Sequence, residues 1–380
     1  MRFPNTCFGI SLGLAGQAIM WKVIGDSPSM RSAFGATGSK TTSTCFWVAA
    51  CVILAVFSAV YAAKLVLHQQ LVHFEWLNAH RAHFFNTPHL AVLMIAIGVP
   101  PIISDRTGLR AVLYTMVVVQ TILAETFYAR WLFDGASNMG AARPPFLLSV
   151  IGWLLLSILA QQVDLDHLAA FFFGGGFILY LLVIVSIFLS MHNSIGEKGS
   201  PSLFLLIAPP AVAAIALGGF KGTDSFPNEA MMLLGWCCVL LLLLLRLGPK
   251  LLAEPEALGA YWAYVFPLSA LATGFVKYAE SDGTTTSMAV ACVFVALSCA
   301  SLVVVTFRMW WHHVGVVRGK KRWEDPIVGA WQQGQEVTTT RTGSYGSGTA
   351  NEENAAIAQE AALLARDGPV VRETAAGLGV

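Results

Sequence analysis

Residues Met231 to Leu252 read MMLLGWCCVLLLLLLRLGPKLL, and Arg246 and Lys250 are the only charged residues among them. A helix needs about 20 apolar residues, each adding about 1.5 Å, to cross the hydrocarbon core of a bilayer. This stretch therefore predicts a membrane-spanning helix. Similar apolar blocks, separated by short polar breaks, fill most of the 380 residues, of which 56% are hydrophobic and 12% charged. The sequence thus predicts an all-α membrane protein.

Ten such blocks divide the chain. We expect transmembrane helices near residues 6–24, 45–67, 86–103, 109–132, 145–163, 168–190, 202–220, 230–252, 258–278 and 286–311. Residues 1–5 are then a short cytoplasmic N-terminal segment, and residues 6–313 are one ten-helix transmembrane domain. Residues 314–380 form a polar tail containing the stretch VTTTRTGSYGSGT. We expect this cytoplasmic tail to be largely disordered, because it offers too little apolar surface for a core.

The charges and cysteines exclude several classes of function. The formal net charge is +1, without a basic stripe or a zinc-type spacing of Cys and His, so we expect no nucleic-acid partner and no metal. No nucleophile and base are arranged for catalysis, so we expect neither an enzyme nor a cofactor. Most cysteines lie inside apolar blocks and should be small buried side chains rather than a disulfide framework: Cys7, Cys45, Cys51, Cys237, Cys238, Cys292 and Cys299.

An even number of spans places both termini on one side of the membrane. With the N-terminus inside, the cytoplasmic loops collect Lys64, Arg81, Arg130 and the basic cluster at residues 318–322. Cytoplasmic loops of membrane proteins carry an excess of Lys and Arg, so this distribution favours cytoplasmic termini.

Odd-numbered spans differ from even-numbered ones because Gly or Pro interrupts them. A broken helix exposes backbone polar groups, which a protein interior or a water-filled cavity tolerates and lipid does not. Odd spans therefore look like an inner ring that lines a path, although Gly and Pro are also common in membrane helices that merely pack closely. The interruptions are Gly9 and Gly13 in the first span, Pro88 in the third, Gly152 in the fifth, Pro209 and Pro210 in the seventh, and Pro267 in the ninth.

The middles of the odd spans carry no ionisable residue, and the clearest mid-span carboxylate, Glu125, lies on an even span. Proton-coupled carriers usually keep ionisable residues at mid-membrane. An apolar path would instead hold an anion weakly, through backbone N–H groups and helix dipoles. Such weak binding favours conduction.

Six motifs resemble the slow-type (S-type) anion channel branch of the tellurite-resistance/C4-dicarboxylate transporter family. The resemblance implies ten helices in five hairpins around a central pore, a homotrimer with one pore in each subunit, and a location in the plasma membrane. The motifs are PNTCFGISLGLAGQAIMW from Pro4, HRAHFFNTPHLAVLMIAIGVPP from His80, YARWL from Tyr128, SVIGW from Ser149, PSLFLLIAPPAVAAIA from Pro201 and YWAYVFPLSALATGFVKYAE from Tyr261.

The same resemblance implies roles for single residues. Phe266, beside Pro267, would be a gate whose ring fills an apolar constriction. Trp153 and Leu154 stand where related channels often carry a second pore phenylalanine, so the closure would be looser or rebuilt by Trp153. Arg81 matches a basic residue of the family and would stabilise the cytoplasmic vestibule.

Lys277, at the outer end of the ninth span, would draw anions toward the pore or simply extend its amine to the membrane interface.

The sequence thus favours a channel that passes chloride, nitrate or similar small anions. The alternative is a proton-coupled carrier of dicarboxylates such as malate, and a third possibility is a non-conducting sensor or scaffold. Because few residues precede the first helix, kinase control is expected in the tail, at Thr338, Thr339, Thr340, Thr342 or Ser344.

Overall fold

The computed structural model describes residues 3–78, 81–133, 142–194, 201–220, 226–247 and 258–317. All regular structure within these ranges is helical, which confirms the all-α fold class. His80 and residues 318–380, with the basic cluster and the possible kinase sites, lie outside the described residues. The α-helices are α1 (Gly9–Asp26), α2 (Pro28–Phe34), α3 (Ala36–Leu67), α4 (Gln69–Leu77), α5 (Asn86–Ile97), α6 (Arg106–Leu132), α7 (Leu147–Gln162), α8 (Asp166–Ser194), α9 (Ala208–Leu217), α10 (Asn228–Leu245), α11 (Val265–Asp282) and α12 (Thr285–Val317).

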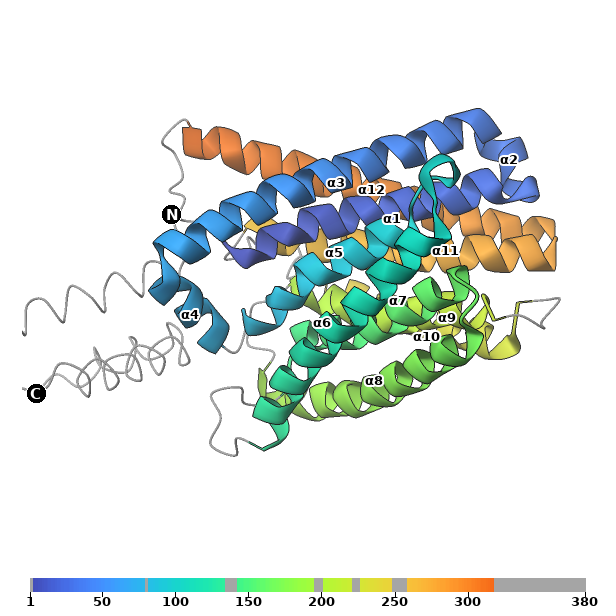
Figure 1. The fold of residues 1–380 in the computed structure, drawn as a ribbon. Coiled ribbons are helices and arrows are strands. Elements are labelled where there is room, and N and C mark those ends of the chain that lie inside the picture. Colours follow the sequence, from blue (N-terminus) through green and yellow to red (C-terminus); the bar gives the residue numbers. More distant parts are fainter. Residues whose placement is uncertain are drawn as a thin grey trace, which may run out of the picture.

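The long helices form five consecutive pairs, in which α1 contacts α3, α5 contacts α6, α7 contacts α8, α9 contacts α10 and α11 contacts α12 (Figure 1). Among the described residues, seven helical segments are long and apolar enough to cross a membrane, and the apolar segments Ala82–Ile97 and Pro201–Leu217 are shorter. The number of ten spans therefore stays a prediction.

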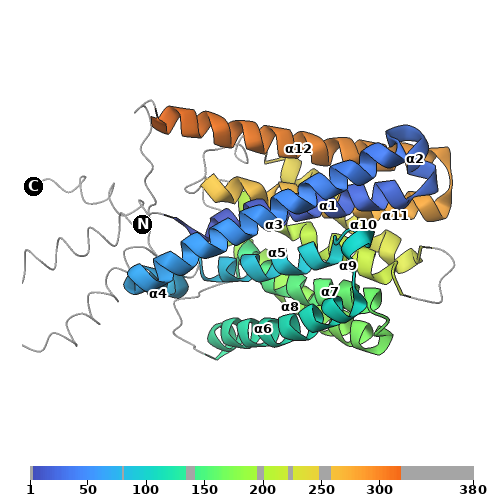
Figure 2. The ribbon, with the colours of Figure 1, turned by 45° about the horizontal axis from the view of Figure 1, so that its top comes forward.

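The first helix of each pair lies inside the bundle. These five helices, here called the inner ring, contact one another in the closed order α1, α5, α7, α9, α11 and back to α1. In the most apolar stretch of each helix, 61% of residues are buried in α1 and 78% in α7, against 6% in α3 and 22% in α6 and α12. Figure 2 shows α12 and α6 on opposite outer sides of the bundle, with α1, α5 and α7 between them. The division into an inner and an outer ring agrees with the sequence prediction.

Most helix boundaries lie within four residues of the predicted ones. The larger differences are at the starts of α3, α9 and α11 and at the ends of α5, α10 and α12. Helix α3 begins at residue 36 instead of 45, since its polar first turns precede the apolar block from which the span was predicted. Ser39 Oγ donates to the carbonyl of Gly35 over 2.8 Å, and Ser43 Oγ donates to the carbonyl of Ala18 over 2.8 Å. The short helices α2 and α4 were not predicted, because neither is long enough to stand out as an apolar block.

Candidate functional site: the interior of the inner ring

Every inner-ring helix is preceded by a short 3-10 helix at the same end of the bundle. These segments are η1 (Asn5–Phe8), η2 (Ala82–Phe85), η4 (Pro144–Phe146), η5 (Pro201–Leu206) and η7 (Leu258–Ala263). They also contact one another in a closed order, η1, η2, η4, η5, η7 and back to η1. We call this ring of 3-10 segments the collar. It surrounds the end of the bundle at which all five inner helices begin.

The prolines mark the change from 3-10 to α-helix. Pro88 is the third residue of α5, Pro209 and Pro210 are the second and third of α9, and Pro267 is the third of α11. Proline lacks an N–H group, and in the first turn of a helix that group has no intrahelical partner. The breaks therefore lie near the collar and not at the centre of the membrane.

The glycines Gly13 and Gly152 support the second of the two roles that the sequence left open, which is close packing of helices rather than interruption of a helix. Gly9 begins α1, but Gly13 and Gly152 lie inside continuous α-helix and do not interrupt it, so that prediction is wrong for both. A Cβ atom on Gly13 would lie 2.7 Å from Cε3 of Trp262, and one on Gly152 would overlap the amide of Gln120. These glycines allow neighbouring helices to approach closely, which is a known use of small residues in membrane helices.

Phe266 lies in the first turn of α11 and is 1% exposed. Phe275, nine residues later, stacks on Phe294 of the outer helix α12, with ring centroids 4.3 Å apart. At about 100° per residue, nine residues correspond to two and a half turns, so Phe266 occupies the opposite face of α11 from Phe275. Its ring points away from α12 and approaches α1, where a Cβ atom on Gly16 would lie 3.6 Å from Cδ2 of Phe266.

Lys277 follows Phe266 by eleven residues, or about three turns, and therefore lies on the same face of α11. Its side chain is half-buried, and it forms no ion pair or hydrogen bond with any residue that the structure describes. Ser269 and Thr273 lie between them on this face. Their hydroxyls donate to carbonyls of their own helix, that of Ser269 to Phe266 over 2.8 Å and that of Thr273 to Ser269 over 2.7 Å.

Trp153 and Leu154 contact the outer helix α8. The ring centroid of Trp153 lies 5.7 Å from that of Phe172. A Cβ atom on Gly176 would lie 2.8 Å from Cβ of Trp153 and 3.3 Å from Cδ2 of Leu154. Trp153 thus belongs to the interface between α7 and α8, which differs from the expectation that it narrows the pore.

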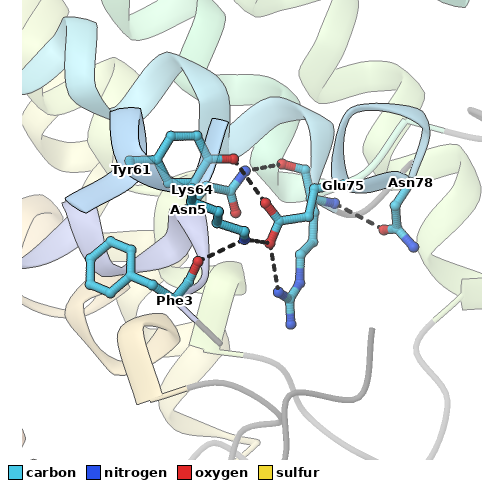
Figure 3. A network of polar contacts seen from close by, with 7 residues as sticks. Phe3, Asn5, Tyr61, Lys64, Glu75 and Asn78 are labelled. Carbon is cyan, nitrogen blue, oxygen red and sulfur yellow. Dashed lines mark hydrogen bonds and ion pairs between the residues drawn. The ribbon is translucent and has the colours of Figure 1, made fainter. Parts of the chain in front are cut away.

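Arg81 precedes the collar segment η2 and belongs to a buried polar network (Figure 3). Its centre is Glu75 of α4, whose carboxylate lies 2.9 Å from Lys64 Nζ and 3.6 Å from an Nη atom of Arg81. Tyr61 donates to the same carboxylate over 2.8 Å. The side chains of Lys64 and Glu75 are fully buried, at 0% exposure.

This network attaches the start of the chain to the collar. Lys64 Nζ also donates to the carbonyl of Phe3 over 2.8 Å, and Asn5 Nδ2 donates to the carbonyl of Arg81 over 3.0 Å. Sequence reasoning treated Lys64 as an ordinary loop charge and did not consider Glu75. A signal was present, since Lys64 falls inside a predicted span, where an ionisable residue usually needs a partner.

The sequence model described as voltage-dependent anion channel matches residues 2–310 of the chain. This chain belongs to the voltage-dependent anion channel family. It is 27% identical over 310 residues to the guard cell S-type anion channel SLAC1 of Arabidopsis thaliana, a match that covers 80% of this chain and 55% of that protein. It is also 26% identical over 313 residues to S-type anion channel SLAH3 (80% and 48%), and 28% identical over 283 residues to SLAH1 (72% and 72%), both from the same plant.

The chain spans about half the length of the first curated relatives it matches. The family match and the apolar helices together establish an integral, multi-pass membrane protein of the voltage-dependent anion channel family. They also confirm the resemblance to S-type anion channels that the motifs indicated.

The close contact between α1 and α11 gives a first prediction for this family member. Gly16→Ala would bring a Cβ atom into Ser269 Oγ and next to the Phe266 ring, and such overpacking typically costs about 1–3 kcal/mol. We expect a lower thermal unfolding temperature of the detergent-purified protein. The matched control is Gly175→Ala on α8, where no atom lies within 4 Å of the added Cβ. An equal Tm for both variants would contradict close packing at Gly16.

Proposed function

We propose that this chain is an anion channel that passes small anions such as chloride and nitrate passively through the centre of the inner ring, and that Phe266 is its gate. The observation that carries the proposal is the placement of Phe266, which is buried on the face of α11 directed away from α12, within a closed ring of five helices. A bulky apolar ring in such a position closes a path by filling it and excluding water.

The direction of the inner helices supports an anionic substrate. All five begin at the collar, and each helix N-terminus carries the equivalent of about half a positive charge. An anion that enters from the collar meets this positive potential without having to bind a fixed cation. Arg81 would add to it, although Glu75 offsets part of its charge. Lys277 lies on the face of Phe266 toward the opposite end and would attract anions there.

The ionisable residues of the inner helices support passive conduction. His89 of α5 is turned toward the outer helix α6, where its Nε2 atom lies 3.2 Å from the carbonyl oxygen of Met116. The described α7 and α9 contain no Asp, Glu, Lys, Arg or His. A proton relay along the inner ring would need such groups. The alternative of a proton-coupled dicarboxylate carrier for malate is therefore less well supported.

We further propose a homotrimer in the plasma membrane, with one pore in each subunit, the collar and both termini facing the cytoplasm, and a kinase acting on the tail. The distribution of basic residues supports the orientation. The apolar side chains exposed on the outer helices, such as Val52 at 55% and Leu182 at 59%, suit contact with lipid or with another subunit.

Voltage clamp of cells expressing the full chain tests the function. We expect currents whose reversal potential follows the chloride or nitrate gradient and is unchanged when the external pH is stepped. Each anion is replaced in turn by an impermeant organic anion, and untransfected cells supply the background. Currents or malate uptake that follow the proton gradient would favour the carrier, and an absence of anion current at the cell surface would contradict the channel.

A further inference from the structure

The inner helices all end at the side of the bundle opposite the collar, which we call the far mouth. The last carbonyl groups of a helix have no intrahelical partner. At the far mouth several of these carbonyls receive hydrogen bonds from neighbouring inner helices. Gln161 of α7 donates through Nε2 to the carbonyl of Ala216 in α9 over 3.0 Å, and Gln162 donates through Nε2 to the carbonyl of Ile97 in α5 over 3.2 Å.

Lys22 of α1 also binds the end of α5. Its Nζ atom donates to the carbonyl of Ile97 over 3.2 Å and to the carbonyl of Val99 over 2.8 Å. The lysine and Gln162 therefore approach the same carbonyl oxygen from two different helices. The glutamine supplies a neutral donor, whereas the lysine supplies a donor with a full positive charge.

The charge of the donor matters because the five inner helices run in the same direction, so that all of their C-termini lie at the far mouth. Each helix C-terminus carries the equivalent of about half a negative charge, so five together amount to about −2.5 at the far mouth. Left without compensation, this potential would repel an anion that leaves or enters there. Hydrogen bonds from Gln161 and Gln162 satisfy carbonyls but add no charge. A positive charge on the carbonyls reduces the potential directly. Arg31 donates to the last carbonyls of α1, and Arg110 donates to the carbonyl that follows α7, so positive charge already offsets the ends of these two helices. At the end of α5 this charge comes from Lys22.

The acids near Lys22 do not cancel its charge. Asp26, four residues later on α1, is exposed, so solvent screens its effect. Glu280 of α11 accepts hydrogen bonds from Ser27 and Ser29 and is also exposed. Lys22 itself is half-buried, with its amine on the carbonyls of Ile97, the last residue of α5, and of Val99.

We propose that Lys22 raises the anion conductance of the far mouth, by offsetting the negative end of α5. The residue acts by its charge on ions passing the mouth and need not line the narrowest part of the path. This inference rests on the proposed channel function and adds to it a residue that determines throughput.

Single-channel recording of Lys22→Gln tests the idea, because glutamine keeps a donor for the α5 carbonyls and removes the charge. In low salt we expect about a two- to fivefold lower anion conductance, since one unit charge near a path changes local ion concentration by that order. The deficit should shrink in high salt, where the Debye length falls to about 3 Å. Lys22→Arg, which keeps the charge, should conduct like the wild type.

The matched control moves the lysine from α1 to α7. In the double variant Lys22→Gln, Gln162→Lys, the new lysine starts from the residue that already binds the Ile97 carbonyl, and we expect conductance to return toward the wild-type value. The single variant Gln162→Lys should raise conductance above it, which keeps the test valid even where Lys22→Gln fails to fold. If the wild type conducts anions and both Lys22→Gln and Gln162→Lys have the same conductance as the wild type, the role of Lys22 is overturned while the channel function stands. A wild type without anion current would overturn the channel itself.

Discussion

Phe266→Ala is expected to raise the anion current of the intact protein by about tenfold, which corresponds to removing about 1.4 kcal/mol from a permeation barrier. The physical reason is the loss of a large apolar ring that is 1% exposed and that lies beside Gly16 of α1, inside the ring of five helices through which we propose that anions pass. Alanine leaves room for water and a partly hydrated anion. Whole-cell current, normalised to the amount of protein at the cell surface, is the measurement.

Phe275→Ala is the matched control, since it removes the same side chain from the opposite face of the same helix. Phe275 stacks on Phe294 at an interplanar angle of 3°, so its loss should weaken packing between α11 and α12 and lower surface expression without raising the current per channel. If both variants raised the current equally, loosening of α11 would explain the effect. A Phe266→Ala channel no more active than the wild type would remove Phe266 as the gate.

Glu75→Ala is expected to cost about 3–5 kcal/mol of folding stability, the range found when one partner of a buried ion pair is removed. Lys64 would keep its charge at 0% exposure, where the carbonyl of Phe3 and the face of the Tyr61 ring still contact its amine, and Arg81 would lose the same carboxylate. The loss should appear as a much lower Tm of the detergent-purified protein.

Two further variants separate buried charge from simple loss of a side chain. Glu229→Ala removes an exposed carboxylate from the first turn of α10 and should change the Tm little. The double variant Lys64→Met, Glu75→Gln removes both members of the closest pair, and it should be more stable than Glu75→Ala because less uncompensated charge remains buried. A Glu75→Ala protein as stable as the Glu229→Ala protein would show that the network adds nothing to stability.

The long apolar helices could be predicted from the sequence because each is an apolar block of the length needed to cross a bilayer, whereas their pairing into five hairpins was implied by the family resemblance. The inner position of α9 was predicted from a helix break at Pro209 and Pro210, but both prolines lie in the first turn, where they do not interrupt the helix, so the position was predicted correctly and its reason was not. Helix α4 could not be predicted this way. Its nine residues include buried Leu71 and Val72 but also buried Glu75, and only the folded chain shows that Lys64 lies beside that carboxylate.

Side-chain direction was the hardest property to predict for the candidate site. Phe266 and Trp153 are both aromatic residues of inner helices, yet one faces α1 and the other faces α8. Successive side chains on a helix are rotated by about 100°, so a shift of one residue changes the neighbour that a side chain faces. A sequence motif identifies the residue but does not show how its helix is rotated about its axis. The 3-10 collar has a similar limit, because prolines indicate where the α-helix begins but not the hydrogen-bond pattern that precedes it.

The presence of five helices in the inner ring limits how the molecule can move. Carriers that work by alternating access are commonly built from two structural repeats, and one half rocks against the other around a central substrate. Five helices that run in the same direction and close on themselves cannot be divided into two equal halves. No hinge plane passes through such an arrangement without cutting one pair away from its neighbours. In the channel that we propose, the five helices stay in place, and only the side chain of Phe266 has to move for an anion to pass.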